Sequence, residues 1–295
     1  MLPASLSPMV RPISKDTQLC MSLAARPGNF GTRFHNWLYA ALDLDYVYKA
    51  FTTGDLPAAI AGIRALGIRG CAVSMPFKEA CVALVDELDP SAAVIASVNT
   101  IVNTGGVLRA YNTDYVAVQM LAARRGLTPD MGFALRGSGG MARAVAFALR
   151  DAGLVRGVIV ARNEAVGRAL AAEVGFGWQP EVQGLRPELL VNVTPIGMAG
   201  GPEAAEIAFP PDAIANAQVV FDAVALPAET PLVLEARRQG KTVIGGDEVA
   251  TLQALEQFVL YTGVRPSPER VQAAAAYASR PARADRAEEE YPGAS

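Results

Sequence analysis

One glycine-rich segment of the chain has the composition and spacing of a loop that binds the phosphates of a dinucleotide. It reads Gly137-Ser138-Gly139-Gly140-Met141-Ala142, and its first, third and sixth residues fit the pattern G-x-G-x-x-G/A. In such a loop the first glycine permits a tight turn and the second lets the backbone approach a pyrophosphate at a helix N-terminus. The pattern is informative only between a strand and a helix, as predicted here. The alternative is a turn that only packs a helix on a strand.

The residues after the next predicted strand indicate which dinucleotide would bind. NAD sites usually carry Asp or Glu there, which binds the ribose 2′-hydroxyl. Here Arg162 and Asn163 follow the strand, and a guanidinium is planar, permanently charged and suited to the 2′-phosphate of NADP. Glu164 comes next and favours NAD unless it simply occupies the first turn of the following helix. We therefore predict NADP as the cofactor.

A lysine at the end of another predicted strand is a candidate for proton transfer. In Ser74-Met75-Pro76-Phe77-Lys78 the strand ends and Pro76 is expected to begin a helix, with Lys78 in its first turn. A lysine there opposes the helix dipole, so stability does not explain it. A lysine that is partly desolvated or close to positive charge has a lowered pKa and exchanges protons near neutrality. The alternative is a solvated surface lysine.

Three further polar segments lie at or near the ends of predicted strands. Asn112, Thr113 and Asp114 follow a strand over 107–111 and also suit a capped turn. Asn99 lies in an apolar strand over 98–102, where a buried amide needs a partner. A third segment, Asn192-Val193-Thr194-Pro195-Ile196-Gly197-Met198, follows a strand. The carboxyl ends of strands are where open α/β sheets bind ligands.

The hydrophobic pattern around these segments predicts an α/β protein. Helical and strand patterns alternate in the first third, where Asp55 is placed to cap a helix. Between about 116 and 245, strands and helices alternate at the spacing of βαβ units. The predicted strands there are 133–136, 157–161, 189–193, 218–222 and 241–244. Two helical stretches follow, Val249 to Val259 and Arg270 to Ser279.

Composition excludes several classes of function. The chain has 295 residues, 51% of them hydrophobic, and a net charge of -3, which gives no indication of nucleic-acid binding. No apolar run is long enough to span a bilayer, and no signal peptide is recognisable, so we predict a cytoplasmic protein without a membrane partner.

Cysteine and histidine usage gives no indication of disulfide bonds or of a metal site. The three cysteines lack a C-x-x-C pair and are expected to be reduced. Cys81 is expected in the core, on the helix stripe Cys81, Leu84, Val85 and Leu88. With a single histidine, His35, we expect no metal site, and we expect His35 to be structural.

Taken in order, these segments resemble shikimate dehydrogenases over about residues 16 to 279. The matching stretches are Pro76-Phe77-Lys78-Glu79, Val98-Asn99-Thr100, Asn112-Thr113-Asp114, Gly137-Ser138-Gly139-Gly140, Asn192 to Met198, Thr230-Pro231-Leu232 and Gln253-Ala254. The resemblance implies a two-domain α/β enzyme of aromatic amino acid biosynthesis that interconverts 3-dehydroshikimate and shikimate with NADP(H). It implies a substrate-binding catalytic domain over 1–115 completed by 247–279, and a Rossmann-type NADP-binding domain over 116–246. We expect 280–295 to be a mobile tail, and the protein to be a monomer or homodimer.

The resemblance also implies roles for individual residues. Lys78 would exchange the proton of the substrate C3 hydroxyl while hydride moves to or from nicotinamide, and Asp114 would hold and tune the lysine. Residues implied to bind the substrate hydroxyls are Ser74, Asn99 and Gln253. Residues implied to bind the cofactor are Gly137, Ser138, Gly139, Gly140, Arg162, Asn163, Thr194 and Met198.

The chain departs from the family pattern where the substrate carboxylate would bind. The family carries Ser-x-Ser-Pro before a helical His-Asn, whereas this chain has Asn29 and Gly31 in the two serine places. Asn29 or Thr32 can still donate a hydrogen bond. A family tyrosine is replaced by Ala225. The chain therefore looks most like the divergent, shikimate dehydrogenase-like branch. The alternatives are a quinate or aminoshikimate dehydrogenase, or an NADP-binding regulator with weak catalysis.

Overall fold

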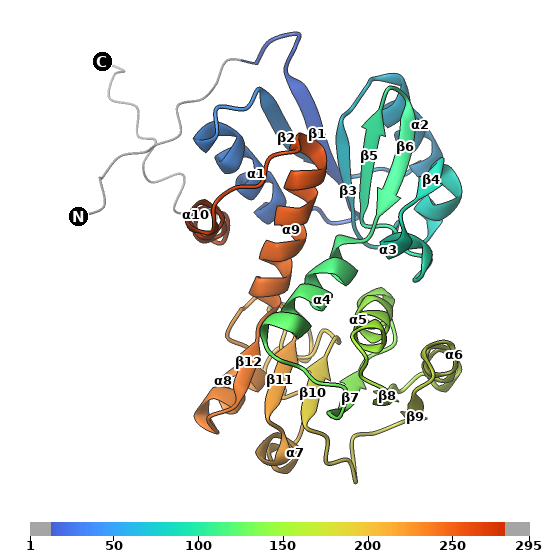
Figure 1. Ribbon diagram of the computed structural model, residues 1–295, viewed down its shortest axis with the longest axis vertical. Helices are drawn as coiled ribbons and strands as arrows, with labels where there is room; N and C mark the ends of the chain where they lie inside the picture. Colours follow the sequence, from blue (N-terminus) through green and yellow to red (C-terminus); the bar gives the residue numbers. More distant parts are fainter. Residues whose placement is uncertain (1–12, 281–295) are drawn as a thin grey trace, which may run out of the picture.

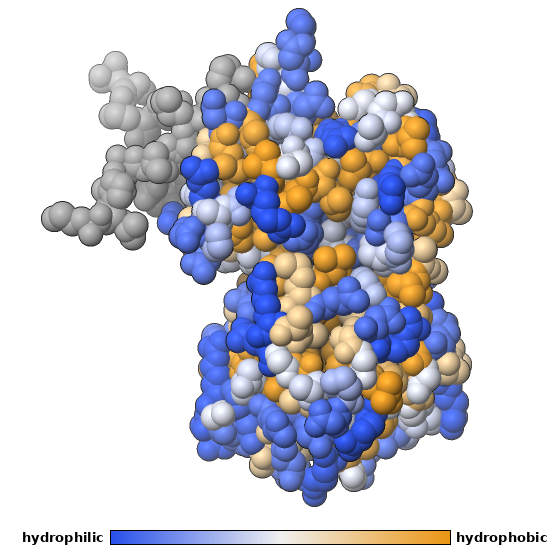
Figure 2. All heavy atoms as spheres, in the orientation of Figure 1, coloured by the Kyte–Doolittle hydropathy of each residue, from blue (hydrophilic) through white to orange (hydrophobic). Residues whose placement is uncertain are grey.

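The computed structural model describes residues 13–280, which form two lobes, each built on a six-stranded sheet (Figure 1). The molecule narrows between the lobes (Figure 2). The α/β, two-domain architecture predicted from the sequence is confirmed, whereas the predicted domain boundaries stay predictions. The predicted tail lies almost wholly outside the described residues. Within the described part of the chain, no helix is long and apolar enough to cross a membrane.

The first sheet brings two functional segments to one edge. Its strand order is β2-β1-β3-β5-β6-β4, and β5 runs antiparallel to both β3 and β6. The strands are β1 (Gln18–Leu23), β2 (Tyr46–Phe51), β3 (Gly70–Val73), β4 (Glu87–Leu88), β5 (Thr100–Thr104) and β6 (Val107–Tyr111). Because β3 and β6 run in the same direction, the segments that follow them, with Lys78 and Asp114, emerge at the same edge.

The second sheet is parallel throughout, with the order β12-β11-β10-β7-β8-β9. Its strands are β7 (Gly132–Arg136), β8 (Arg156–Val160), β9 (Gly177–Gln179), β10 (Leu189–Asn192), β11 (Val219–Asp222) and β12 (Thr242–Ile244). A parallel sheet places the carboxyl ends of all its strands at one edge. The glycine loop after β7, Arg162 after β8 and the Thr194 segment after β10 therefore share that edge.

Helices cover the sheets and connect the lobes. They are α1 (Phe30–Ala41), α2 (Leu56–Ala65), α3 (Pro90–Ala93), α4 (Thr113–Arg124), α5 (Gly140–Asp151), α6 (Glu164–Val174), α7 (Pro211–Asn216), α8 (Pro231–Arg238), α9 (Gly246–Thr262) and α10 (Pro268–Ala278), with a 3₁₀ helix η1 (Ala80–Leu84). Helices α4 and α9 pack together and run from one lobe to the other (Figure 1). An ion pair between Arg125 and Glu248 joins their ends at 2.5 Å.

The segment around Lys78 differs from the sequence prediction. Pro76 does not begin an α-helix, and Lys78 lies in a turn before the 3₁₀ helix. The physical reason is that the Lys78 carbonyl accepts a hydrogen bond from the backbone N–H of Val98, 2.9 Å away. This carbonyl is therefore bonded to a distant segment and not to an N–H one helical turn further along the chain. The predicted stripe is also wrong at its end, because Leu88 lies in β4 and is exposed, although Cys81 is buried as expected.

Candidate active site

Lys78 and Asp114 form the centre of the site. Lys78 Nζ lies 2.5 Å from Asp114 Oδ2, and the two side chains are 19% and 2% exposed. Asn112 caps α4 by accepting a hydrogen bond from the Tyr115 N–H at 3.0 Å. Asp114 therefore stands in the first turn of α4, where the helix dipole favours a negative charge. Its second oxygen, Oδ1, is buried without a hydrogen-bond partner among the described residues, so it remains an acceptor for a ligand.

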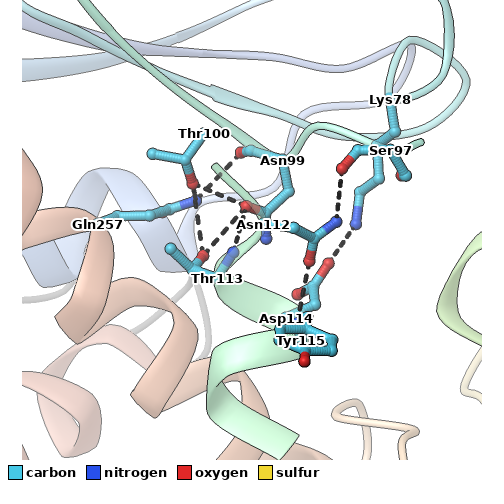
Figure 3. A network of polar contacts seen from close by, with 9 residues as sticks. All are labelled: Lys78, Ser97, Asn99, Thr100, Asn112, Thr113, Asp114, Tyr115 and Gln257. Atoms are coloured by element: carbon cyan, nitrogen blue, oxygen red, sulfur yellow. Dashed lines mark hydrogen bonds and ion pairs between the residues drawn. The ribbon is translucent and has the colours of Figure 1, made fainter. Parts of the chain in front are cut away.

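Asn99 lies beside this pair in a buried polar cluster (Figure 3). Its Oδ1 accepts hydrogen bonds from the Thr113 N–H at 2.7 Å and from Thr100 Oγ1 at 2.8 Å. Asn112 donates its amide to the Ser97 carbonyl at 3.0 Å, which ties α4 to the segment carrying Asn99. The three predicted residues Lys78, Asp114 and Asn99 are therefore held together by protein contacts alone.

The remaining residues predicted to bind the substrate differ from one another in burial and in hydrogen bonding. Thr32, in α1, has a buried hydroxyl that no atom of residues 13–280 hydrogen-bonds. Asn29 is exposed at the N-cap of α1, where its side chain makes no cap bond. Ser74 is exposed after β3, and Gln253 is half-buried on α9. The loop before α1 lies against the Lys78 turn, because the Ala25 N–H donates to the Met75 carbonyl at 3.1 Å.

The glycine loop has the geometry predicted for a phosphate site. Gly137 has φ +129°, and a Cβ there would lie 2.7 Å from Val193 Cγ2. A Cβ on Gly139 or Gly140 would meet nothing within 4 Å. The N-terminus of α5 has no side-chain cap and no acidic residue in its first turn. Its free N–H groups and positive dipole end thus face space into which an anion fits.

Arg162 is the exposed cation at this edge. Its side chain is 79% exposed, and its Nη1 lies 3.6 Å from Glu203 Oε1. Burial, and then the nearby Arg162 charge, lower the pKa of Arg136, so two guanidinium groups share this corner. Glu164 pairs with Arg168 one turn on, at 2.7 Å, as expected of a residue in the first turn of α6. Asn163 accepts a hydrogen bond from the Val166 N–H at 3.2 Å and so caps α6.

The segment after β10 is anchored through buried polar contacts. Asn192 Oδ1 accepts the Thr194 hydroxyl at 2.6 Å, and Asn192 Nδ2 donates to Asp222 Oδ1 at 3.0 Å. Thr230 donates to the other oxygen of Asp222 at 2.6 Å, and burial raises the pKa of that carboxyl. Met198 remains partly exposed beyond this anchor. The fixed backbone thus carries both predicted residues of this segment to the edge with the glycine loop.

A direct contact brings the two halves of the site together. Arg143, in the first turn of α5, donates through Nε to the Ile95 carbonyl at 2.6 Å. Ile95 precedes Asn99 by four residues, and Arg143 follows Gly140 by three. The glycine loop therefore lies next to the segment that carries the substrate side of the site.

His35 lies outside the Lys78–Asp114 pair, with Gln257 of α9 beside it. It is fully buried and stacks on Tyr48 with ring centroids 4.5 Å apart. Burial lowers its pKa to about 3, so the ring is neutral at physiological pH. This agrees with the predicted structural role. Across residues 13–280, no group of three or more His, Cys, Asp or Glu side chains is placed to hold a metal ion.

Two features of the site were missed in the sequence. Gln257 of α9 donates to Thr100 Oγ1 at 3.1 Å, and Tyr115 donates to Asp151 at 2.6 Å, which joins α4 to α5. Neither pairing has a local signal, because the partners are far apart in the chain. The burial of Gln257, which calls for a polar partner, is seen only in the structure.

Comparisons with known proteins agree with this geometry. Residues 30–101 match the family model of the shikimate dehydrogenase substrate binding domain. A shikimate dehydrogenase-like protein of Haemophilus influenzae is 54% identical over 90% of this chain and 98% of its own length. An NADP(+) shikimate dehydrogenase of Moorella thermoacetica is 40% identical over 80% of this chain and 84% of its own. The chain belongs to the shikimate dehydrogenase family.

Solved structures of the family have the same architecture. A shikimate 5-dehydrogenase-like protein superposes with a TM-score of 0.89 at 53% identity, over 91% of this chain and all of the other. The Thermus thermophilus shikimate 5-dehydrogenase, in complex with NADP(H) and shikimate, superposes with a TM-score of 0.79 at 29% identity, over 88% and 99% of the two chains. Relatives thus include both dehydrogenases and proteins named only as dehydrogenase-like.

Proposed function

We propose that this protein is an NADP-dependent oxidoreductase that interconverts 3-dehydroshikimate and shikimate, or a close analogue. The observation that carries the proposal is the largely buried ion pair between Lys78 and Asp114, which lies at an edge of the first sheet. A buried charged pair with a free carboxylate oxygen is costly to maintain for stability alone. It is well suited to hold a substrate hydroxyl and to move its proton.

Each residue of the site has a separate role in the proposed reaction. Bound NADP(H) supplies or accepts the hydride. Lys78 Nζ exchanges the proton of the substrate oxygen, and Asp114 keeps that ammonium group in position and stabilises its charge. The free Asp114 Oδ1 and the Asn99 Nδ2 amide supply an acceptor and a donor for substrate hydroxyls.

The residues of the second lobe fit NADP. Open space beside Gly139 and Gly140, at an uncapped helix N-terminus, suits a pyrophosphate. Arg162 is exposed at the end of β8, where a 2′-phosphate would lie, while Glu164 is occupied by Arg168. Thr194 and Met198 would lie along the nicotinamide. These features support NADP over NAD.

The segment for the substrate carboxylate supports weak binding of shikimate. Asn29 is exposed and Gly31 has no side chain, so of the three positions Thr32 alone offers a buried hydroxyl donor. Loss of a polar partner for a bound anion costs about 1–3 kcal/mol. We therefore expect detectable but poor turnover of shikimate, or a related cyclic polyol acid as the physiological substrate.

A substrate and cofactor screen tests the proposal. The purified protein is assayed by NADPH absorbance and fluorescence with shikimate, quinate and other cyclohexene and cyclohexane polyol carboxylates, each with NADP and with NAD. Turnover of at least one compound with NADP is expected. Tight NADP binding without turnover of any compound would contradict the enzyme assignment and favour a regulatory role.

A further inference from the structure

Gln257 is a buried polar residue of α9 that lies outside the catalytic pair yet contacts the substrate side of the site. It is 2% exposed, and its Nε2 lies 3.1 Å from Thr100 Oγ1 and 3.3 Å from the Asn99 carbonyl. These contacts link residues more than 150 positions apart in the chain. Figure 3 shows Gln257 and Lys78 on opposite sides of Asn99.

The direction of each hydrogen bond in this cluster follows from the chemistry of its members. The amide nitrogen of Gln257 can only donate, so Thr100 Oγ1 accepts from it. The Thr100 proton is then directed to Asn99 Oδ1, 2.8 Å away. Asn99 Oδ1 also accepts from the Thr113 N–H and, at 3.2 Å, from the Thr113 hydroxyl. The oxygen of the Asn99 amide is thus fully occupied within the protein.

The nitrogen of the same amide is not occupied. Asn99 Nδ2 is buried, and among the residues that the structure describes it has no hydrogen-bond partner. A buried amide left unpaired is unfavourable, and a ligand oxygen would satisfy it. Because Asn99 Oδ1 is held by its partners, the amide cannot exchange its two ends, and the site presents a donor at this point.

We propose that Gln257 is a positioning residue, which through Thr100 fixes the donor end of Asn99 toward the substrate. Helix α9 thereby becomes part of the substrate site at a point beyond Gln253. The inference rests on the proposed function, because it takes the ligand of Asn99 to be the substrate. The Thr113 N–H still holds Asn99 when Gln257 is replaced, so the expected effect is that of one buried hydrogen bond and not of the whole cluster.

The test is the variant Gln257→Met, which keeps the side-chain length and removes the amide. With shikimate and NADP we expect KM for shikimate to rise about three- to tenfold, as for one hydrogen bond, while kcat changes less than twofold and the Kd of NADP is unchanged. Tyr261→Phe is the matched control. Tyr261 lies on the same helix, fully buried, and its hydroxyl has no partner within residues 13–280, so its loss should leave both constants unchanged.

A double-mutant cycle separates positioning from a general packing defect. If Gln257 acts through Asn99, then Gln257→Met should raise KM less than twofold in an Asn99→Ala background. Equal rises in both backgrounds, or an unchanged KM in the single variant, would overturn the inference. Thr100→Val removes the intervening hydroxyl and should reproduce the rise in KM, which keeps the test decisive if Gln257→Met fails to fold.

The outcome also distinguishes this inference from the function on which it rests. A wild-type protein that neither binds nor oxidises shikimate or an analogue refutes the proposed function, and the substrate role of Asn99 with it. A wild-type protein that turns over substrate while Gln257→Met behaves like Tyr261→Phe refutes the role of Gln257 alone.

Discussion

The two halves of the site are built in opposite ways. On the substrate side, Lys78, Asp114 and Asn99 are mostly buried and held by short contacts with one another or with their neighbours. On the cofactor side, the glycine loop offers backbone groups beside open space, and Arg162 extends into solvent. The first half is therefore preorganised by the fold, whereas the second is completed by the charge of its ligand. Mutations on the substrate side should affect turnover or substrate binding, and mutations on the cofactor side should affect cofactor affinity.

The largest effect is expected for Lys78→Ala. Loss of the group that moves the proton should lower kcat by about 10²- to 10⁴-fold, whereas the Kd of NADP should be nearly unchanged, because Lys78 belongs to the other half. Stopped-flow absorbance and NADPH fluorescence measure the two constants. Lys49→Ala, at an exposed lysine of β2, is the control and should retain full activity. Normal turnover by Lys78→Ala would show that the catalytic assignment is wrong.

Arg162→Ala should lower the affinity for NADP, which Lys78→Ala leaves nearly unchanged. Loss of one charge-assisted hydrogen bond to the 2′-phosphate should weaken NADP binding by about 10- to 100-fold, while NAD, which lacks that phosphate, should bind as before. Titration of both cofactors by calorimetry gives the ratio. Arg270→Ala, at an exposed arginine of α10 in the first lobe, controls for loss of positive charge. Equal turnover with both cofactors, unaffected by Arg162→Ala, would contradict the choice of NADP.

The buried character of the first lobe predicts a dependence of stability on pH. Burial lowers the pKa of His35 from 6.5 to about 3. Below pH 6.5 the unfolded chain therefore binds a proton that the folded protein does not, and stability falls as the pH decreases toward 3. For this one group the loss between pH 7 and pH 5 is about 2 kcal/mol.

Urea unfolding of the wild type and of His35→Phe at both pH values measures this contribution. The aromatic neighbours of His35, such as Tyr48 and Phe258, do not titrate in this range. The variant should therefore lose about 2 kcal/mol less than the wild type. The same dependence in both proteins would place the titrating group elsewhere.

Sequence patterns were sufficient for features that repeat along the chain. Five of the six parallel strands of the second lobe, all except β9, and the glycine loop between β7 and α5 follow from hydrophobic periodicity and local turn chemistry. The polar residues after β3 and β6 could be selected as candidates, although a solvated lysine and a capped turn explained them equally well. The pairing of Lys78 with Asp114, however, came from family resemblance, because no local pattern links residues on separate strands.

The features that the sequence could not reveal depend on contacts between distant segments. Pro76 followed by a helical pattern suggested a helix start, but the Lys78 carbonyl is used by Val98, which only the folded sheet makes possible. Gln257 resembles any polar residue of a helix until its partner Thr100 is known. Tertiary hydrogen bonds of this kind override local secondary-structure preference. They produce no periodic pattern in the sequence from which they could be predicted.

The smallest predicted effect concerns the acid that pairs with Arg162. Glu203 is within ion-pair distance of that guanidinium, so a 2′-phosphate must compete with a carboxylate already present in the protein. Glu203→Gln should remove the competitor and tighten NADP binding about two- to fivefold, as expected of an exposed ion pair worth about 0–1 kcal/mol. The gain should disappear in high salt, which screens exposed charges.

Glu206→Gln is the matched control for this change. Both glutamates act to raise the pKa of Arg136, but Glu203 also forms an ion pair with Arg162. A general rise in positive potential would tighten NADP binding equally in both variants, whereas direct competition affects Glu203→Gln more strongly. If neither variant alters the ratio of NADP to NAD affinity, Glu203 does not compete with the 2′-phosphate, and the ion pair with Arg162 contributes nothing measurable to cofactor choice.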